Sequence, residues 1–259
     1  MKLLIGIMAA PRPVETVDVV LDSLKSAGFG SDLTFLFCEP GEYLTGHQKV
    51  VRPHTLSPSK DLKPSKEGRY GNFQNFVQTL RDLVSVSDNH DAIMIVEDDA
   101  VFASNVRPLV SHQIDSGFDG MLSLYTPNVR QFFDQDTAGF RTVTREWFFG
   151  GLALVLPIEL AKKIAEEDTR GWPGSKRQPP GILAFEREAS DAWIGRRVRA
   201  HRKLIKGWNP SMVSHYTPLG RPEGNSSRVD GRSHTGPRQA KRFIGEGMDA
   251  EVYFKSFSE

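Results

Sequence analysis

The stretch IMIVEDDAVF, residues 93–102, decides how the rest of this chain is interpreted. Its apolar residues Ile93–Val96 predict a buried strand, and three consecutive carboxylates follow: Glu97, Asp98 and Asp99. Like charges at this spacing repel one another, and a carboxylate beside a core is costly unless a positive group pairs with it. Strand alternation predicts that Glu97 and Asp99 lie on one side and Asp98 on the other. Carboxylates at the carboxyl end of a strand are typical ligands of Mg²⁺ or Mn²⁺, whereas an acidic turn facing water is the simpler alternative.

The segments around this stretch alternate between strand and helix patterns. Apolar runs predict strands at residues 2–8, 33–37, 121–125 and 151–156, and helical spacing predicts helices at 14–28, 72–84, 157–167 and 190–201. Gly28 is placed to end the first helix and Asn72 to cap the second, while the polar residues 52–71 predict a loop. This order predicts an α/β fold, with a Rossmann-like, doubly wound mixed sheet flanked by helices, in a single domain.

The composition is that of a globular protein, with 39% hydrophobic and 25% charged residues. The single cysteine, Cys38, excludes an internal disulfide and permits a reducing compartment. The opening residues MKLLIGIMAAPRP have too short an apolar run for a signal peptide, and no stretch approaches the ~20 apolar residues of a membrane span. We therefore expect a soluble cytoplasmic protein without a membrane span.

Positive charge is concentrated near the C-terminus, although the net charge is only +1. The stretch from Arg196 to Arg242 contains twelve Lys or Arg against Glu223 and Asp230, a local charge of +10, which leaves −9 for the remainder. Such a stretch favours a polyanionic partner, a diphosphate or a nucleic acid. A solvated helix face followed by a polar tail would give the same composition.

Five segments follow one another along the chain in a recognisable order: IGIMAAPRPVETVDVVLDSLKSAGF, GNFQNFVQTL, IMIVEDDAVF, SDAWIG and NPSMVSHY…GNSS. In these motifs and their order the chain resembles a GT-A-type glycosyltransferase, of the family-2-like kind found in bacteria and phages. The resemblance implies one GT-A domain over residues 1–259. Residues 1–125 would form its nucleotide-sugar-binding half, and residues 126–259 its acceptor-binding half with the basic C-terminal segment.

The same resemblance implies a metal site. In the family the last carboxylate of the acidic motif binds the metal and the first lies near the nucleotide ribose, which assigns these roles to Asp99 and Glu97. A histidine after a PS…H segment is a further ligand, which points to His215. An imidazole ligand suits Mn²⁺ better than Mg²⁺, so we expect Mn²⁺ or else Mg²⁺ as the cofactor. A divalent ion that bridges the diphosphate would stabilise the leaving group as a Lewis acid.

Contacts to the nucleotide-sugar donor are implied for several further residues. These are Ala10, Pro11, Arg12, Glu39, Asn75, Asp98, Ser226, Ser227 and Arg228. Trp147 and Phe148 are candidates for stacking on a sugar or base, with core packing as the alternative. The loop at residues 224–232 could wrap the diphosphate with backbone N–H groups, or it could simply be a surface loop.

Asp191, at the start of the helix predicted for 190–201, resembles the carboxylate that deprotonates the acceptor hydroxyl in inverting GT-A enzymes. Glu188 is the second candidate for this base. Aspartate is also a favoured helix cap, a role that needs no catalysis. If the enzyme retains the sugar's configuration, Asp191 would not be the base.

These inferences predict a metal-dependent, inverting glycosyltransferase that uses a nucleotide-sugar donor, a UDP-sugar in the first place. Two acceptor classes stay open: a hydroxymethylated base in phage DNA, in which case the enzyme acts in the host cytoplasm, and a glycan or lipopolysaccharide. A Mg²⁺-dependent nucleotidyl or phosphoryl transferase is one alternative, but residues 6–13 supply neither a phosphate-binding Gly loop nor a nucleophilic Asp. A non-catalytic nucleic-acid-binding domain is another, although the acidic triplet would repel a polyanion.

Overall fold

A computed structural model describes the larger part of the chain. The described residues are 1–9, 16–38, 50–51, 64–126, 133, 137–144, 148, 150–167, 190–216 and 242–256, with the backbone alone for 50–51 and 64–72. The elements in chain order are β1 (Leu3–Ala9), α1 (Val17–Leu24), the π-helical turn η1 (Lys25–Phe29), β2 (Leu33–Cys38), β3 (Val50–Val51), α2 (Pro64–Ser85), β4 (Ala92–Glu97), β5 (Ala100–Phe102), α3 (Arg107–Asp115), β6 (Met121–Ser123), β7 (Gly139–Thr142), β8 (Ala153–Pro157), α5 (Ile158–Ala165), α6 (Ser190–Ala200), β9 (Ile205–Asn209), β10 (Val213–His215) and α7 (Ala250–Lys255).

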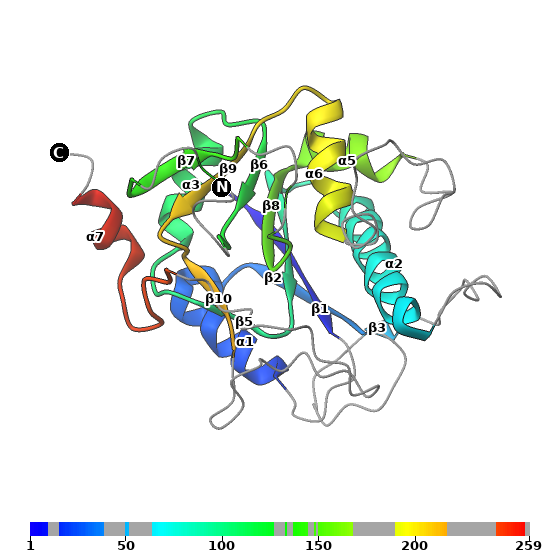
Figure 1. Cartoon of the computed structure of the whole chain (residues 1–259), viewed down its shortest axis with the longest axis horizontal. Helices are drawn as coiled ribbons and strands as arrows, with labels where there is room; N and C mark the ends of the chain where they lie inside the picture. Colours follow the sequence, from blue (N-terminus) through cyan, green and yellow to red (C-terminus); the bar gives the residue numbers. More distant parts are fainter. Residues whose placement is uncertain are drawn as a thin grey trace.

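The described strands form an eight-stranded mixed sheet in the order β3-β2-β1-β4-β8-β6-β9-β7 and a two-stranded sheet of β5 and β10 (Figure 1). In the large sheet β1 runs parallel to both β2 and β4, whereas β8 is antiparallel to β4 and β6. Helices cover both faces of the sheet. The predicted α/β class, with a doubly wound mixed sheet flanked by helices, is therefore confirmed; the division into two functional halves stays a prediction.

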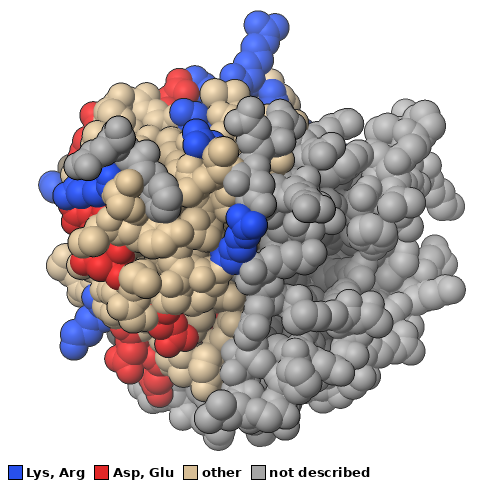
Figure 2. Space-filling view, turned by 60° about the vertical axis from the view of Figure 1, so that its left-hand side comes forward, with Lys and Arg blue, Asp and Glu red and all other residues tan. Residues whose placement is uncertain are grey.

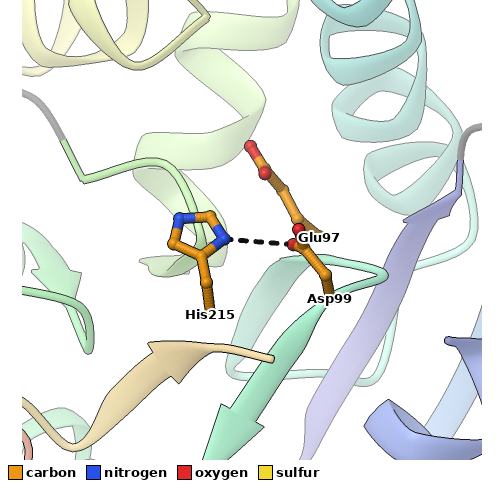
Figure 3. A group of neighbouring side chains, drawn as sticks. All are labelled: Glu97, Asp99 and His215. Atoms are coloured by element: carbon orange, nitrogen blue, oxygen red, sulfur yellow. Dashed lines mark ion pairs between the residues drawn. The ribbon is translucent and has the colours of Figure 1, made fainter. Parts of the chain in front are cut away.

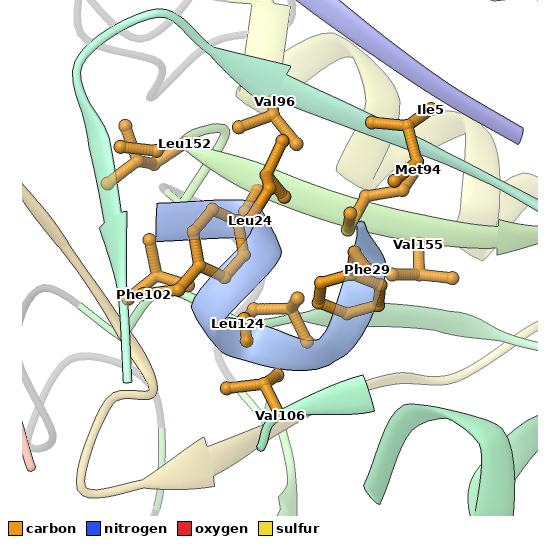
Figure 4. Close-up of a cluster of buried hydrophobic side chains, with 14 of the residues drawn as sticks. Ile5, Leu24, Phe29, Met94, Val96, Phe102, Val106, Leu124, Leu152 and Val155 are labelled. Atoms are coloured by element: carbon orange, nitrogen blue, oxygen red, sulfur yellow. The ribbon is translucent and has the colours of Figure 1, made fainter. Parts of the chain in front are cut away.

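The alternation of β1 explains how both faces become buried. Leu3, Ile5 and Ile7 belong to a core with α1 and η1, while Leu4 and Met8 belong to a second core with α2, α5 and α6. In the first core, Leu24 of α1 and Phe29 of η1 gather with Ile5, Met94 and Val96 of the sheet (Figure 4). A strand that is buried on both sides is apolar throughout, which is why β1 and β4 are recognisable as continuous apolar runs.

Two details of the helices bear on the sequence predictions. Gly28 has a φ of +91°, which favours glycine, and it breaks the helical backbone one residue before η1 ends at Phe29, close to the expected end of the helix. By contrast, α2 begins at Pro64, so the expected loop at 52–71 ends earlier and Asn72 lies inside the helix instead of capping it. The prediction was wrong because it followed the apolar stripe, which starts at Phe73. A proline at the first helical position and helix-forming Lys, Glu and Arg extend the helix before that stripe.

Four further strands lie around β4: β5, β6, β8 and β10. The strands predicted at 121–125 and 151–156 are β6, which ends two residues earlier than predicted, and β8, which begins two residues later and ends one residue later. Strand β5 begins three residues after the end of β4 and pairs with β10, so the two-stranded sheet lies beside the carboxyl end of β4. Among the described helices, none combines the length and the apolar character that crossing a membrane requires.

Candidate metal centre and carboxylate site

The pairing of β5 with β10 brings Asp99 and His215 together from positions far apart in the sequence. His215 is paired with Ala100 in the antiparallel register, so it lies beside the residue that follows Asp99. One step further, the backbone N–H of Tyr216 donates to the carbonyl oxygen of Asp99 at 2.6 Å. The ladder therefore fixes the two side chains on adjacent strands at one end of the small sheet.

Glu97 reaches the same place from the large sheet. It is the last residue of β4, opposite Met8 in the parallel register with β1, and its backbone N–H donates to the carbonyl oxygen of Leu152 at 2.9 Å. The carboxyl ends of β1 and β4 thus meet at this edge, where ligands bind in doubly wound sheets.

Side-chain ligand atoms of Glu97, Asp99 and His215 all lie within 4.8 Å of one another (Figure 3). Nδ1 of His215 faces Oδ1 of Asp99 at 3.3 Å. Both side chains are nearly buried, at 2% exposure for Asp99 and 8% for His215. Burial of carboxylates at such short range is unfavourable without a compensating cation.

The residues present suit a divalent ion. Two ligand atoms at ~2.1 Å from one ion and at right angles to each other are ~3.0 Å apart, which is close to the observed spacing of Asp99 and His215. Nδ1 of His215 is buried and makes no hydrogen bond within the described part of the chain, so it is available as a ligand. The ring of Tyr125 packs edge-on against that of His215, with centroids 5.2 Å apart, and holds its orientation. Two carboxylates and an imidazole are ligands that Mn²⁺ accepts readily and Mg²⁺ less so.

A third carboxylate, that of Asp191, lies beside this group. Asp191 stands in the first turn of α6, where Oδ2 accepts the backbone N–H of Gly150 at 3.1 Å and Oδ1 accepts that of Ala192 at 2.8 Å. A Cβ at Gly151 would lie 3.2 Å from Cβ of Asp191 and 3.9 Å from Oε1 of Glu97, so the two carboxylates flank this glycine.

The surroundings of Asp191 make its carboxyl a stronger base than an ordinary aspartate. Burial raises the pKa of Asp191 to about 6, and the negative charge of Glu97 acts in the same direction, while the N–H groups of Ala192 and Gly150 act against them. A carboxyl with a pKa near neutrality is suited to accept a proton from a hydroxyl at physiological pH. The structure therefore places a candidate base next to a candidate metal site.

Other predicted site residues have different positions. Asp98 is buried at 2% exposure, lies outside the group of Glu97, Asp99 and His215, and donates its backbone N–H to the carbonyl oxygen of Met8 at 3.0 Å. Asn75 is buried on α2, so its role toward a donor stays a prediction. The remaining predicted residues lie outside the described residues: Ala10, Pro11, Arg12, Glu39, Trp147, Glu188, Ser226, Ser227 and Arg228.

The side chain of Phe148, a candidate for stacking on a sugar or base, lies instead in the hydrophobic core. It is 1% exposed and belongs to the core beneath α2, α5 and α6, where it packs so closely on α6 that a Cβ at Gly195 would lie 2.5 Å from its own Cβ. An aromatic ring in this position fills the core and does not stack on a sugar or a base.

Three basic residues of the described part of the basic stretch contact other side chains of the fold. Arg197 pairs with Glu167 at 2.8 Å, Lys203 pairs with Asp119, and Nζ of Lys206 lies about 5 Å from the ring centroids of two phenylalanines. Lys and Arg are interspersed with Asp and Glu on the described part of the face in Figure 2. Arg202 and Arg242 of the same stretch are exposed, and residues 217–241 lie outside the described part, so a polyanionic partner for the stretch stays a prediction.

Sequence reasoning missed the backbone groups that join the carboxylates. Gly150 supplies the N–H that holds Asp191, and Leu152 supplies the carbonyl oxygen that holds Glu97. Two consecutive glycines before a predicted strand were the available signal, because glycine is where another chain segment can approach closely.

Comparisons with known proteins add little to this description. No family model matches the chain, and no curated protein matches it. Among solved structures it is similar to the one titled "Crystal Structure of A197 from STIV", with 11% identity, a TM-score of 0.47, and coverage of 84% of this chain and 86% of that one.

Proposed function

We propose that this protein is a metal-dependent glycosyltransferase of the GT-A type, which transfers a sugar from a nucleotide-sugar donor to a hydroxyl group. The observation that supports this best is the convergence of Glu97, Asp99 and His215 within 4.8 Å at the carboxyl end of β4. The second support is Asp191, a carboxyl with a pKa of about 6 placed beside Glu97. The motif order described above is the third.

In this proposal Asp99 and His215 hold a divalent ion, Mn²⁺ or Mg²⁺, and Glu97 lies at the side of the donor. When bound, the ion would offset negative charge on the departing nucleoside diphosphate. Asp191 accepts the proton of the acceptor hydroxyl as that oxygen attacks the anomeric carbon, and inversion of configuration follows from attack opposite the leaving group. The N–H of Gly150 orients the Asp191 carboxylate for this step. A UDP-sugar as donor, and a DNA base or a glycan as acceptor, belong to the same proposal.

The test is thermal unfolding with nucleoside diphosphates and nucleotide sugars, each in Mn²⁺ and in EDTA. A ligand that binds only the folded state raises the unfolding free energy by about 2.7 kcal/mol at one hundred times its dissociation constant. We expect a shift with one nucleotide class that requires Mn²⁺ and is lost in Asp99→Asn. Asp119→Asn, which removes an exposed carboxylate in the loop before β6, is the control and should retain the shift.

The products distinguish glycosyl transfer from the phosphoryl-transfer alternative. A glycosyltransferase breaks the bond between the anomeric carbon and oxygen, so it releases a nucleoside diphosphate from the nucleotide sugar. Release of a nucleoside monophosphate and a sugar phosphate would instead indicate cleavage within the diphosphate. No Mn²⁺-dependent shift with any nucleotide would contradict the proposal and leave a binding module as the better interpretation.

A further inference from the structure

The small sheet that carries the candidate metal ligands has two ends. Asp99 and His215 stand at one end, beside the last paired residues of β5 and β10. At the other end the ladder continues for one step, where the N–H of Ala103 donates to the carbonyl oxygen of Met212 at 2.9 Å. The strands then separate into two short segments that contain Ser104 and Ser211.

The C-terminal segment, residues 242–256, binds the backbone of both separated segments. On the β10 side it pairs with Ser211, whose N–H donates to the carbonyl oxygen of Arg242 at 2.8 Å and whose carbonyl oxygen accepts the N–H of Ile244 at 3.2 Å. Ser211 is itself fully buried.

On the β5 side the same segment pairs with Ser104. The N–H of Ser104 donates to the carbonyl oxygen of Met248 at 3.1 Å, and its carbonyl oxygen accepts the N–H of Ala250 at 2.9 Å. The side-chain amide of the next residue, Asn105, donates to Oδ2 of Asp249 at 2.6 Å. One stretch of nine residues thus joins both strands of the ladder at the end away from the metal ligands.

Helix α7 anchors this segment to the protein core. Asp249 caps the helix by accepting the N–H of Val252 at 3.0 Å, and this hydrogen bond, with that from Asn105, lowers the pKa of Asp249. Ala250 and Phe254 are buried in the same core as Phe102 of β5. The side chain of Asp249 therefore joins two parts of the fold, because it accepts one hydrogen bond at the start of α7 and another from Asn105, which follows β5.

We propose that the C-terminal segment is a clasp that holds β5 and β10 together and thereby fixes the spacing of Asp99 and His215. The residues of the clasp are positioning residues, since they lie at the opposite end of the ladder from the site. The inference rests on the proposed metal site. Because docking of the clasp and binding of a cation both favour the closed ladder, each must strengthen the other by the same factor.

The first experiment measures Mn²⁺ affinity by titration calorimetry in the full chain. Asp249→Ala is the clasp variant, and Glu167→Ala is the matched control, because Glu167 also holds two donors, Arg197 and His201, each at 2.8 Å but far from the ladder. We expect Asp249→Ala to weaken Mn²⁺ binding about 5-fold or more, the lower range of couplings between sites. The control should stay within about twofold, and Asp249→Asn, which keeps one acceptor oxygen for the helix cap but cannot also accept from Asn105, should recover part of the affinity.

The second experiment does not depend on metal. Amide hydrogen exchange in EDTA reports the opening of the ladder at Tyr216, whose N–H is bonded to the carbonyl oxygen of Asp99. We expect Asp249→Ala to accelerate exchange at Tyr216 about 5-fold or more relative to exchange at Glu97, whose N–H is bonded within the large sheet.

The outcomes separate the two proposals. If the wild-type protein does not bind Mn²⁺, the metal site of the proposed function is wrong, and exchange at Tyr216 alone then decides on the clasp. Equal acceleration in Asp249→Ala and Glu167→Ala would show a general loss of stability and overturn the clasp. Unchanged exchange at Tyr216 in Asp249→Ala would overturn it as well, whatever the affinity for Mn²⁺.

Discussion

The carboxyl of Asp191 provides a direct test of the site, because its pKa ties the stability of the protein to pH. Its pKa is raised from an ordinary value of 3.8 to about 6, so the folded state holds the proton more tightly than the unfolded state. The contribution of Asp191 to the unfolding free energy is therefore greatest below the unfolded pKa, declines as the pH rises from about 4 to about 6, and is level above that. We expect Asp191→Asn to remove this decline.

The size of the effect follows from the pKa difference. A difference of roughly 2 pKa units corresponds to about 3 kcal/mol of unfolding free energy at full ionisation. Two features reduce it: Asp191 is partly exposed, so water screens its charge, and an asparagine cannot accept hydrogen bonds from both Gly150 and Ala192. The variant should therefore be more stable than the wild type by roughly 1–2 kcal/mol at pH 8, with little or no advantage at pH 4.

Urea unfolding of both proteins at a series of pH values between 4 and 8, in EDTA, measures this difference. Asp249→Asn is the control with no decline, because the lowered pKa of Asp249 stabilises the folded state above the unfolded pKa and this stabilisation is lost only in stronger acid, so its difference from the wild type should be nearly constant across this range. A stability difference between wild type and Asp191→Asn that does not change across this range would refute the assignment of a raised pKa. A difference that favours the wild type at pH 8 would do the same.

Three further predictions concern the fold and the metal centre. Gly6→Ala places a Cβ 2.9 Å from Cδ1 of Leu83 and should destabilise the protein by about 1–3 kcal/mol, measured by urea unfolding. Arg107→Ala leaves the nearly buried Asp32 without its two guanidinium bonds, so a loss of roughly 1–3 kcal/mol is expected by the same assay. His215→Ala should weaken Mn²⁺ binding by on the order of 10-fold or more in calorimetric titration, and unchanged affinity would exclude it as a ligand.

The strands at the centre of the fold could be predicted from the sequence because burial on both faces makes them apolar throughout. Ile5 and Met94 mark such runs, and the helix that Gly28 ends has a clear apolar face. The beginning of α2 could not be predicted in this way, since residues 64–72 carry no apolar stripe. Strands β7 and β9 were missed because Arg141 and Lys206 interrupt their apolar residues, and their pairing depends on residues far apart in the sequence.

In the candidate site, the positions of the carboxylates after β4 could be predicted from the local sequence, whereas the position of His215 depends on the pairing of strands far apart in the sequence. The alternation after β4 correctly placed Glu97 and Asp99 together and Asp98 apart. The partnership of Asp99 with His215 follows from the register of β5 and β10, which no local pattern encodes; the family resemblance supplied it instead. The glycine that lies between Glu97 and Asp191 had no recognisable role until the three-dimensional arrangement placed it there.

Glu97 takes part both in the candidate metal centre and in the surroundings of Asp191. Glu97 lies with Asp99 and His215 in the candidate metal centre, and its charge is also one of the causes that raise the pKa of Asp191. A cation held by the first group would offset that charge, so the pKa of Asp191 must fall when the metal centre is filled. The charged, proton-accepting form of Asp191 is therefore favoured most when the cation that the proposed reaction needs is present. In the proposed function, a protein without the cation would keep a larger fraction of Asp191 protonated near pH 6, so the state of the proposed base would depend, through Glu97, on whether the candidate metal centre is occupied.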